Sequence, residues 1–253
     1  MKKRFFILAL LMIMLVSSLF AVSNESLIMK GNNLYSNGNY SEALETYNQL
    51  LNSGYVSLEL YYNIGNSYFK MNKIPDAILF YERAKRISPD DEDLNFNLRV
   101  ANLKIVDRIN EVPKLFFIEW YDSLSSLHSS SGWSYMTIVF SWLTFILLAG
   151  YFLIWNITVR KISFFASITA FLITILCIVF ALQQYSKENS RDEAIIFAPS
   201  VYIKSSPDKE STDLFILHEG TKIKILDEVG NWKKIKIADG NIGWLPDKTI
   251  EII

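Results

Sequence analysis

The chain has 253 residues, 51% of them hydrophobic, and its 25 basic and 26 acidic side chains nearly cancel. A chain with this charge balance has no large positive surface for a polyanion, so we expect no nucleic-acid partner. A single cysteine, Cys177, excludes an intramolecular disulfide and any metal site built from several cysteines.

The first 23 residues have the layout of a secretory signal peptide. Three basic residues at positions 2–4 precede an apolar run, 5–16, and small residues follow it. Cleavage after Ala21 and cleavage after Ser23 both suit the small-residue rule for such peptides. An uncleaved anchor is the alternative, and it would leave the following residues on the same side of the membrane.

From residue 24 the sequence repeats small and aromatic residues at intervals of 34. The matched pairs are Gly31 and Gly65, Ala43 and Ala77, and Tyr47 and Tyr81. This pattern resembles the tetratricopeptide repeat, in which small residues let two antiparallel helices approach closely. We expect repeats over about 24–57 and 58–91. A third, incomplete copy predicts a helix over 92–110 that caps the array.

The resemblance implies that the concave face of the array binds an extended peptide. The candidate peptide-binding residues are Asn32, Tyr35, Tyr62, Asn66 and Phe69. A family variant grips a terminal carboxylate with cations, but Ile28, Asp93 and Asn97 stand where these would be needed. For Tyr62 and Phe69, packing between helices is an equally good alternative to lining the groove.

Residues 111–132 form an aromatic-rich juxtamembrane segment. Glu119 and Asp122 make it too polar to cross a membrane. A helix lying in the membrane interface fits this composition. Packing against the repeats is the alternative.

Two apolar runs, 135–157 and 162–182, contain no charged residue and lie within the predicted transmembrane helices 133–157 and 162–185. Each exceeds the roughly 20 residues that a helix needs to cross about 30 Å of hydrocarbon. A backbone in lipid must satisfy its own hydrogen bonds, so each run is expected to be a helix. We predict a transmembrane hairpin with a turn at 158–161. A buried helical pair of a soluble protein is the alternative.

Arg160 and Lys161 are the charges of the predicted turn. Short basic loops stay in the cytoplasm, so both flanking regions are expected on the outer face. Small residues that fall on one face of each helix predict a packing seam, although such residues are also simply tolerated in membranes. They are Ser134, Thr137, Ser141 and Thr144 in the first helix, and Ser163, Ala166, Ser167, Ala170, Thr174, Cys177 and Ala181 in the second.

Residues 192–253 alternate apolar and polar side chains between turn signals, which is typical of short strands. The strings Gly230-Asn231-Trp232 and Gly243-Trp244-Leu245, with their spacing, resemble bacterial SH3-type domains. This predicts a small β-barrel. The candidate ligand face holds Tyr202, Trp232 and Trp244, and burial in the barrel core is the alternative for the two tryptophans.

The expected fold is therefore multi-domain: an α-helical tetratricopeptide solenoid, a two-helix transmembrane hairpin and a small SH3-like β-barrel. This order of parts is similar to the BatE family of bacterial aerotolerance-operon proteins. The resemblance implies partners among von Willebrand factor A-type proteins and a MoxR-type ATPase, in a membrane complex linked to envelope stress.

No catalytic set of side chains is apparent, since His128 and His218 are isolated in the sequence. We expect a non-enzymatic scaffold in the bacterial cytoplasmic membrane, without cofactor or metal, whose modules bind protein partners on the outer face. The alternative is a membrane-anchored module whose barrel binds the cell wall. A sensor that signals through the hairpin is a third option, but the short turn offers the cytoplasm little to read.

Overall fold

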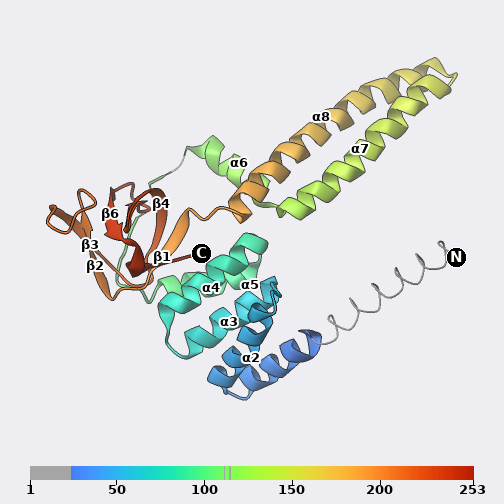
Figure 1. Ribbon diagram of the computed structural model, residues 1–253. Coiled ribbons are helices and arrows are strands. Elements are labelled where there is room, and N and C mark those ends of the chain that lie inside the picture. Colours follow the sequence, from blue (N-terminus) through green and yellow to red (C-terminus); the bar gives the residue numbers. More distant parts are fainter. Residues whose placement is uncertain (1–23, 111, 114) are drawn as a thin grey trace, which may run out of the picture.

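The computed structural model describes residues 24–110, 112–113 and 115–253. The predicted signal peptide, 1–23, lies outside this part. The described residues form a helical array, a long helical hairpin and a β-sheet (Figure 1). The three-part architecture expected from the sequence is therefore confirmed.

The array begins with helical residues 24–36. It continues through α2 (Tyr40–Asn52), α3 (Leu58–Lys70), α4 (Ile74–Ile87) and α5 (Glu92–Asn102). A Cβ atom added at Gly31 would lie 2.4 Å from the ring of Tyr47, and one at Gly65 would lie 2.6 Å from the ring of Tyr81. The repeated glycines therefore make the close helix contacts that the 34-residue pattern predicted.

The helix α5 begins at a cap, because the Asp91 side chain accepts a hydrogen bond from Leu94 N. It ends at Asn102, so the prediction of a helix over 92–110 is wrong in its second half. Residues 103–110 instead run along the barrel, where Ile105 packs against Gly220 and Ile109 joins the barrel core. Apolar contacts with the barrel therefore hold residues 103–110 in a non-helical path, and α5 does not continue through them.

The hairpin consists of α7 (Ser130–Leu153) and α8 (Ile157–Glu188). Among the described residues, these two helices are long and apolar enough to cross a membrane. The turn lies at 154–156, not at the predicted 158–161. Asn156 starts α8, because its side chain accepts hydrogen bonds from Thr158 N and Val159 N. Arg160 and Lys161 consequently lie in the first turns of α8.

Small residues of α8 face α7, as the seam prediction required. The buried ones, spaced alternately by four and three residues, are Ser163, Ser167, Ala170, Thr174 and Cys177. This is the spacing of a left-handed helix pair. On α7, Thr137, Ser141 and Thr144 are half-buried, whereas Ser134 is exposed. Small residues let two such helices approach closely.

The segment before the hairpin forms α6 (Phe116–Ser126). It is fixed to the base of the hairpin, because Ser125 O accepts hydrogen bonds from Trp133 Nε1 and Gln184 Nε2, both at 2.8 Å. Its aromatic side chains Phe116 and Trp120 are 82% and 68% exposed.

Within the described residues, seven strands form one antiparallel sheet in the order β3-β2-β6-β5-β4-β1-β7. They are β1 (Glu193–Ile196), β2 (Ser200–Lys204), β3 (Asp213–His218), β4 (Lys222–Val229), β5 (Trp232–Lys236), β6 (Ile242–Pro246) and β7 (Ile250–Ile252). A short 3-10 helix, η1 (Asp247–Thr249), precedes β7. Alternate residues point inward and make the core of the barrel. The core residues are Ala194, Ile196, Val201, Ile203, Leu217, Ile223, Ile235, Ile237 and Leu245.

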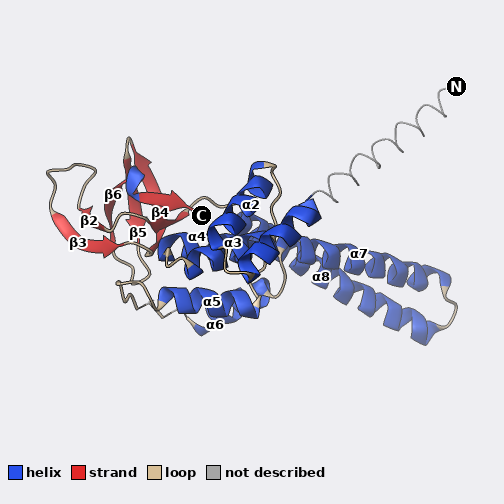
Figure 2. Cartoon of the chain, turned by 90° about the horizontal axis from the view of Figure 1, so that it is seen from below, coloured by secondary structure: helices blue, strands red, loops and turns tan. Residues whose placement is uncertain are grey.

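The sheet packs against the end of the array, and both lie at the end of the hairpin opposite its turn (Figures 1 and 2). Ile195 of β1 and Ile253 belong to the same buried cluster as Ile78 of α4 and Leu94 of α5. The barrel thus covers the apolar end that an array of repeats would otherwise expose.

Candidate functional site

The Asn32 side chain is held by its own chain on the inner face of the array. Its Oδ1 accepts hydrogen bonds from Tyr47 OH at 2.7 Å and from Asn63 Nδ2 at 3.0 Å. Its Nδ2 donates to Glu59 Oε1 at 3.1 Å. Burial raises the pKa of Tyr47, so its hydroxyl stays protonated as a donor at neutral pH. Asn32 therefore links consecutive helices, with its oxygen fully used and one of its two N–H groups donated to Glu59.

The same arrangement recurs 34 residues later around Asn66. Its Oδ1 accepts from Tyr81 OH at 2.7 Å and from Asn97 Nδ2 at 2.9 Å, and Asn97 Nδ2 also donates to Tyr62 OH at 2.8 Å. Asn66 Nδ2 has no hydrogen-bond partner among the described residues. Both N–H groups of Asn66 therefore remain for a ligand, whereas one N–H of Asn32 is taken by Glu59.

A cavity of about 280 Å³ opens beside this second unit. Its lining residues are Tyr35, Tyr62, Asn66, Phe69, Lys70, Tyr81, Asn97 and Val100. Four of the five predicted peptide-binding residues thus come together, whereas Asn32 lies outside the cavity. Tyr62 and Phe69 are half-buried, and both line the open space.

Two lysines at the cavity were not predicted from the sequence. Lys70 lines it, and Lys104 Nζ lies 4.6 Å from the centre of the Phe69 ring. Neither lysine has a carboxylate partner within the part of the chain that the structure describes. Lys104 follows α5, where the repeat pattern has ended, so the repeat register gave no signal for it. The cavity offers aromatic walls to an apolar group and cationic donors at its edge.

The three aromatic candidates of the barrel lie on one outer face. Trp244 of β6 pairs with Lys204 of β2 and with Lys234 of β5, and directly paired residues share a face of the sheet. Trp232 precedes Lys234 by two residues and Tyr202 precedes Lys204 by two, so both join this face. Neither tryptophan belongs to the buried barrel core. Tyr202 is 58% exposed.

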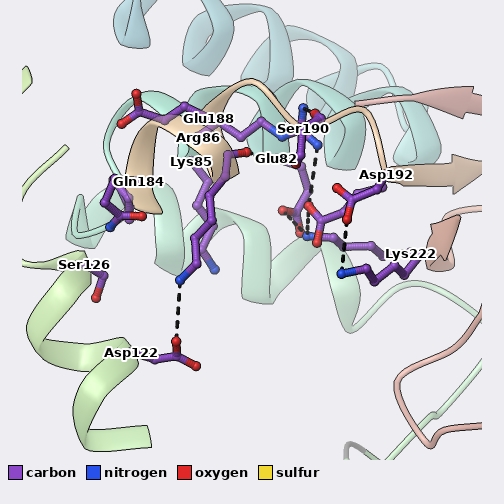
Figure 3. Close-up of a pocket in the computed structure, with 14 residues that line it drawn as sticks. Glu82, Lys85, Arg86, Asp122, Ser126, Gln184, Glu188, Ser190, Asp192 and Lys222 are labelled. Atoms are coloured by element: carbon purple, nitrogen blue, oxygen red, sulfur yellow. Dashed lines mark hydrogen bonds and ion pairs between the residues drawn. The ribbon is translucent and has the colours of Figure 1, made fainter. Parts of the chain in front are cut away.

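A second cavity, of about 440 Å³, lies where the array, the hairpin and the barrel meet (Figure 3). Residues of α4, α6, the end of α8, β1 and β4 line it. They are Glu82, Lys85, Arg86, Pro89, Asp122, Ser126, Gln184, Lys187, Glu188, Ser190, Asp192, Glu193, Lys222 and Lys224. No sequence pattern marks this site, because its residues are far apart along the chain and belong to three separate parts.

Comparison with known families identifies two modules. Residues 58–91 match the tetratricopeptide repeat, and residues 199–251 match the bacterial SH3 domain. No curated protein matches the chain. Both modules are typically binding modules without catalytic activity, so the matches indicate protein binding and are compatible with cell-wall binding.

Proposed function

We propose that this chain is a non-enzymatic scaffold, anchored in the bacterial cytoplasmic membrane, that holds a protein partner in the groove of its repeats. The observation that carries the proposal is the cavity between Tyr35, Tyr62 and Phe69. An apolar side chain of an extended peptide fits such a space, and the free amide of Asn66 suits the peptide backbone. Aromatic side chains at the centre of an interface commonly supply most of its binding energy.

The hairpin supports anchoring with both modules on the outer face. The array and the barrel lie at one end of it, and Arg160 and Lys161 lie near the turn at the other end (Figure 1). Basic residues beside a short loop favour its retention in the cytoplasm. Together with the signal-peptide pattern of the first 23 residues, this supports a groove on the outer side of the membrane.

The similarity to the BatE family adds a context for the partner. In that context the groove would hold a segment of a von Willebrand factor A-type protein of an envelope-stress complex. We assign no catalytic role to the chain, and its two identified modules are of kinds that bind other molecules.

Crosslinking followed by pull-down of the full chain from native membranes tests the proposal. Replacing Tyr62 and Phe69 by alanine should release the partner, because truncating one such aromatic costs about 2 kcal/mol, or about 30-fold in affinity. The matched control replaces Tyr202 and Trp244 on the barrel and should leave capture intact. Circular dichroism checks that both variants stay folded. Loss of capture only in the barrel variant would move the binding function to the barrel.

The alternative function is binding of the cell wall by the barrel. It is favoured by the grouping of Tyr202, Trp232 and Trp244 on one outer face. Co-sedimentation of the solubilised full chain with purified cell wall tests it. Retention that depends on Tyr202 and Trp244, and not on Tyr62 and Phe69, would establish this alternative.

A further inference from the structure

The cavity where the three parts meet is lined by charges that are mostly neutralised within the protein (Figure 3). Lys222 Nζ lies 2.9 Å from Glu82 and 3.0 Å from Glu193, and Lys224 Nζ lies 3.1 Å from Asp192. Glu188 accepts hydrogen bonds from the backbone N–H and the hydroxyl of Ser130. Arg86 Nη1 donates to the backbone oxygens of Ser190 and Ile253. The carboxylates of Glu82, Asp192, Glu193 and Glu188 therefore already have partners within the protein.

Two lysines on the side of the hairpin are satisfied less well. Lys85 is half-buried and has no acidic partner among the described residues. Lys187 Nζ lies 3.5 Å from Asp122 Oδ1, and no other carboxylate of the described residues forms an ion pair with it. Lys187 is exposed, so its long ion pair with Asp122 is screened by water and weak. The half-buried ammonium group of Lys85 has no such partner, which is unfavourable, so this corner of the cavity attracts an anion.

The position of the cavity along α8 indicates which anion would reach it. Lys187 lies five residues beyond Leu182, where the apolar run ends, and five residues of helix rise about 7.5 Å. The headgroup layer of a bilayer is about 5–7 Å thick on each side of the hydrocarbon. Tyr185, Tyr135 and Trp120 are all strongly exposed at this end of the hairpin, as expected for an aromatic belt at the membrane interface.

We propose that Lys85 and Lys187 bind the phosphate group of a membrane phospholipid in this cavity. The proposal rests on the membrane anchoring proposed above. A bound phosphate would give Lys85 a counter-ion and Lys187 a second one beside Asp122, and it would tie α4 of the array to the membrane surface at the end of α8. Lysine side chains beside membrane helices attract the anionic headgroups of lipids by charge.

Native mass spectrometry of the full chain, released from nanodiscs of phosphatidylcholine and phosphatidylglycerol, tests the proposal. The wild type should retain phospholipid. The double variant Lys85→Gln, Lys187→Gln should retain at least about tenfold less, equivalent to about 1.4 kcal/mol. The matched control, Lys209→Gln with Lys248→Gln, changes two exposed lysines of the barrel and should behave as wild type. Equal retention by all three proteins would overturn the proposal.

Two further measurements make the result specific. Lys85→Arg with Lys187→Arg keeps both charges and should retain phospholipid like the wild type. Failure of this variant to retain it would overturn the assignment to these two charges. Glycerol phosphate, added to the protein in detergent, tests a soluble source of the same group. Binding of it as tight as that of phospholipid would overturn the assignment to a lipid.

Carbonate extraction of membranes separates this proposal from the anchoring on which it rests. A wild-type chain that is fully extracted would overturn the anchoring itself. A double variant that stays in the membrane but loses its lipid would support the lipid site in the cavity and leave the anchoring intact.

Discussion

Asp107 joins the segment after the array to the barrel through one carboxylate. Its Oδ2 accepts hydrogen bonds from His218 N at 2.7 Å and Thr221 Oγ1 at 2.6 Å, and its Oδ1 lies 2.7 Å from His218 Nδ1. Burial alone would raise the pKa of Asp107, but the hydrogen bonds from Thr221 and His218 outweigh it and hold the pKa below the ordinary value. The ionised form is therefore the one that the fold stabilises.

We predict that Asp107→Ala destabilises the full chain in detergent by about 2 kcal/mol or more at pH 7, because buried donors lose their acceptor. A carboxyl group with a lowered pKa in the folded state stabilises fully above its unfolded pKa. This contribution disappears as the pH falls from the ordinary value of 3.8 through the lowered folded value. The difference between the thermal melts of wild type and variant should therefore shrink as the pH falls below 3.8. Asp90→Ala, at an exposed position, is the control, and a pH-independent difference would contradict the argument.

The inner face of the array illustrates what residue patterns can predict. The 34-residue period located Tyr62, Asn66 and Phe69, which do line one cavity. The same period placed Asn32 in the groove, yet its oxygen is taken by Tyr47 and Asn63, and one of its N–H groups is taken by Glu59. A repeat register gives the direction of a side chain, but it does not say which neighbours will satisfy its hydrogen bonds.

At the scale of elements, the lengths of the two apolar runs predicted the hairpin. The turn, at 154–156, begins four residues earlier than predicted. The charges of Arg160 and Lys161 suggested a turn around them. The side chain of Asn156 caps α8 before them, and the helix runs through both charges. Similarly, 103–110 was predicted as helix because α5 begins as a repeat copy, while contacts of Ile105 and Ile109 with the distant barrel decide its conformation.

The topology of the hairpin can be tested with fused reporters. A periplasm-active reporter placed after Asp107 or after Ile253 should be active, and one inserted at 154–156 should be inactive. Replacing Arg160 and Lys161 by glutamine should give mixed orientations, because these are the basic residues nearest the turn. Replacing Lys209 and Lys248 by glutamine serves as the control. An active reporter at 154–156 in the wild-type chain would reverse the proposed orientation.

At the scale of the whole molecule, one strand belongs to two cores. Successive residues of a strand point to opposite faces, and β1 uses both. Ala194 and Ile196 belong to the core of the barrel, while Ile195 between them belongs to the cluster formed with α4 and α5. Sequence patterns could not reveal this, because alternation in β1 does not say what lies on its second face. The array and the barrel are therefore coupled in stability although they are separate modules in sequence.

Hydrogen exchange of the full chain can separate the two faces of β1. Ile195→Ala should speed exchange in α4 and α5, because removing a fully buried isoleucine side chain costs about 2–5 kcal/mol at the core that it leaves. Ile196→Ala removes the same atoms from the barrel core and should act first on β4 and β5. The two variants differ only in the face that loses its contact, so each is the control for the other. Identical exchange patterns would mean that array and barrel unfold as one unit, whereas no effect of Ile195→Ala on the array would show that the barrel does not support it.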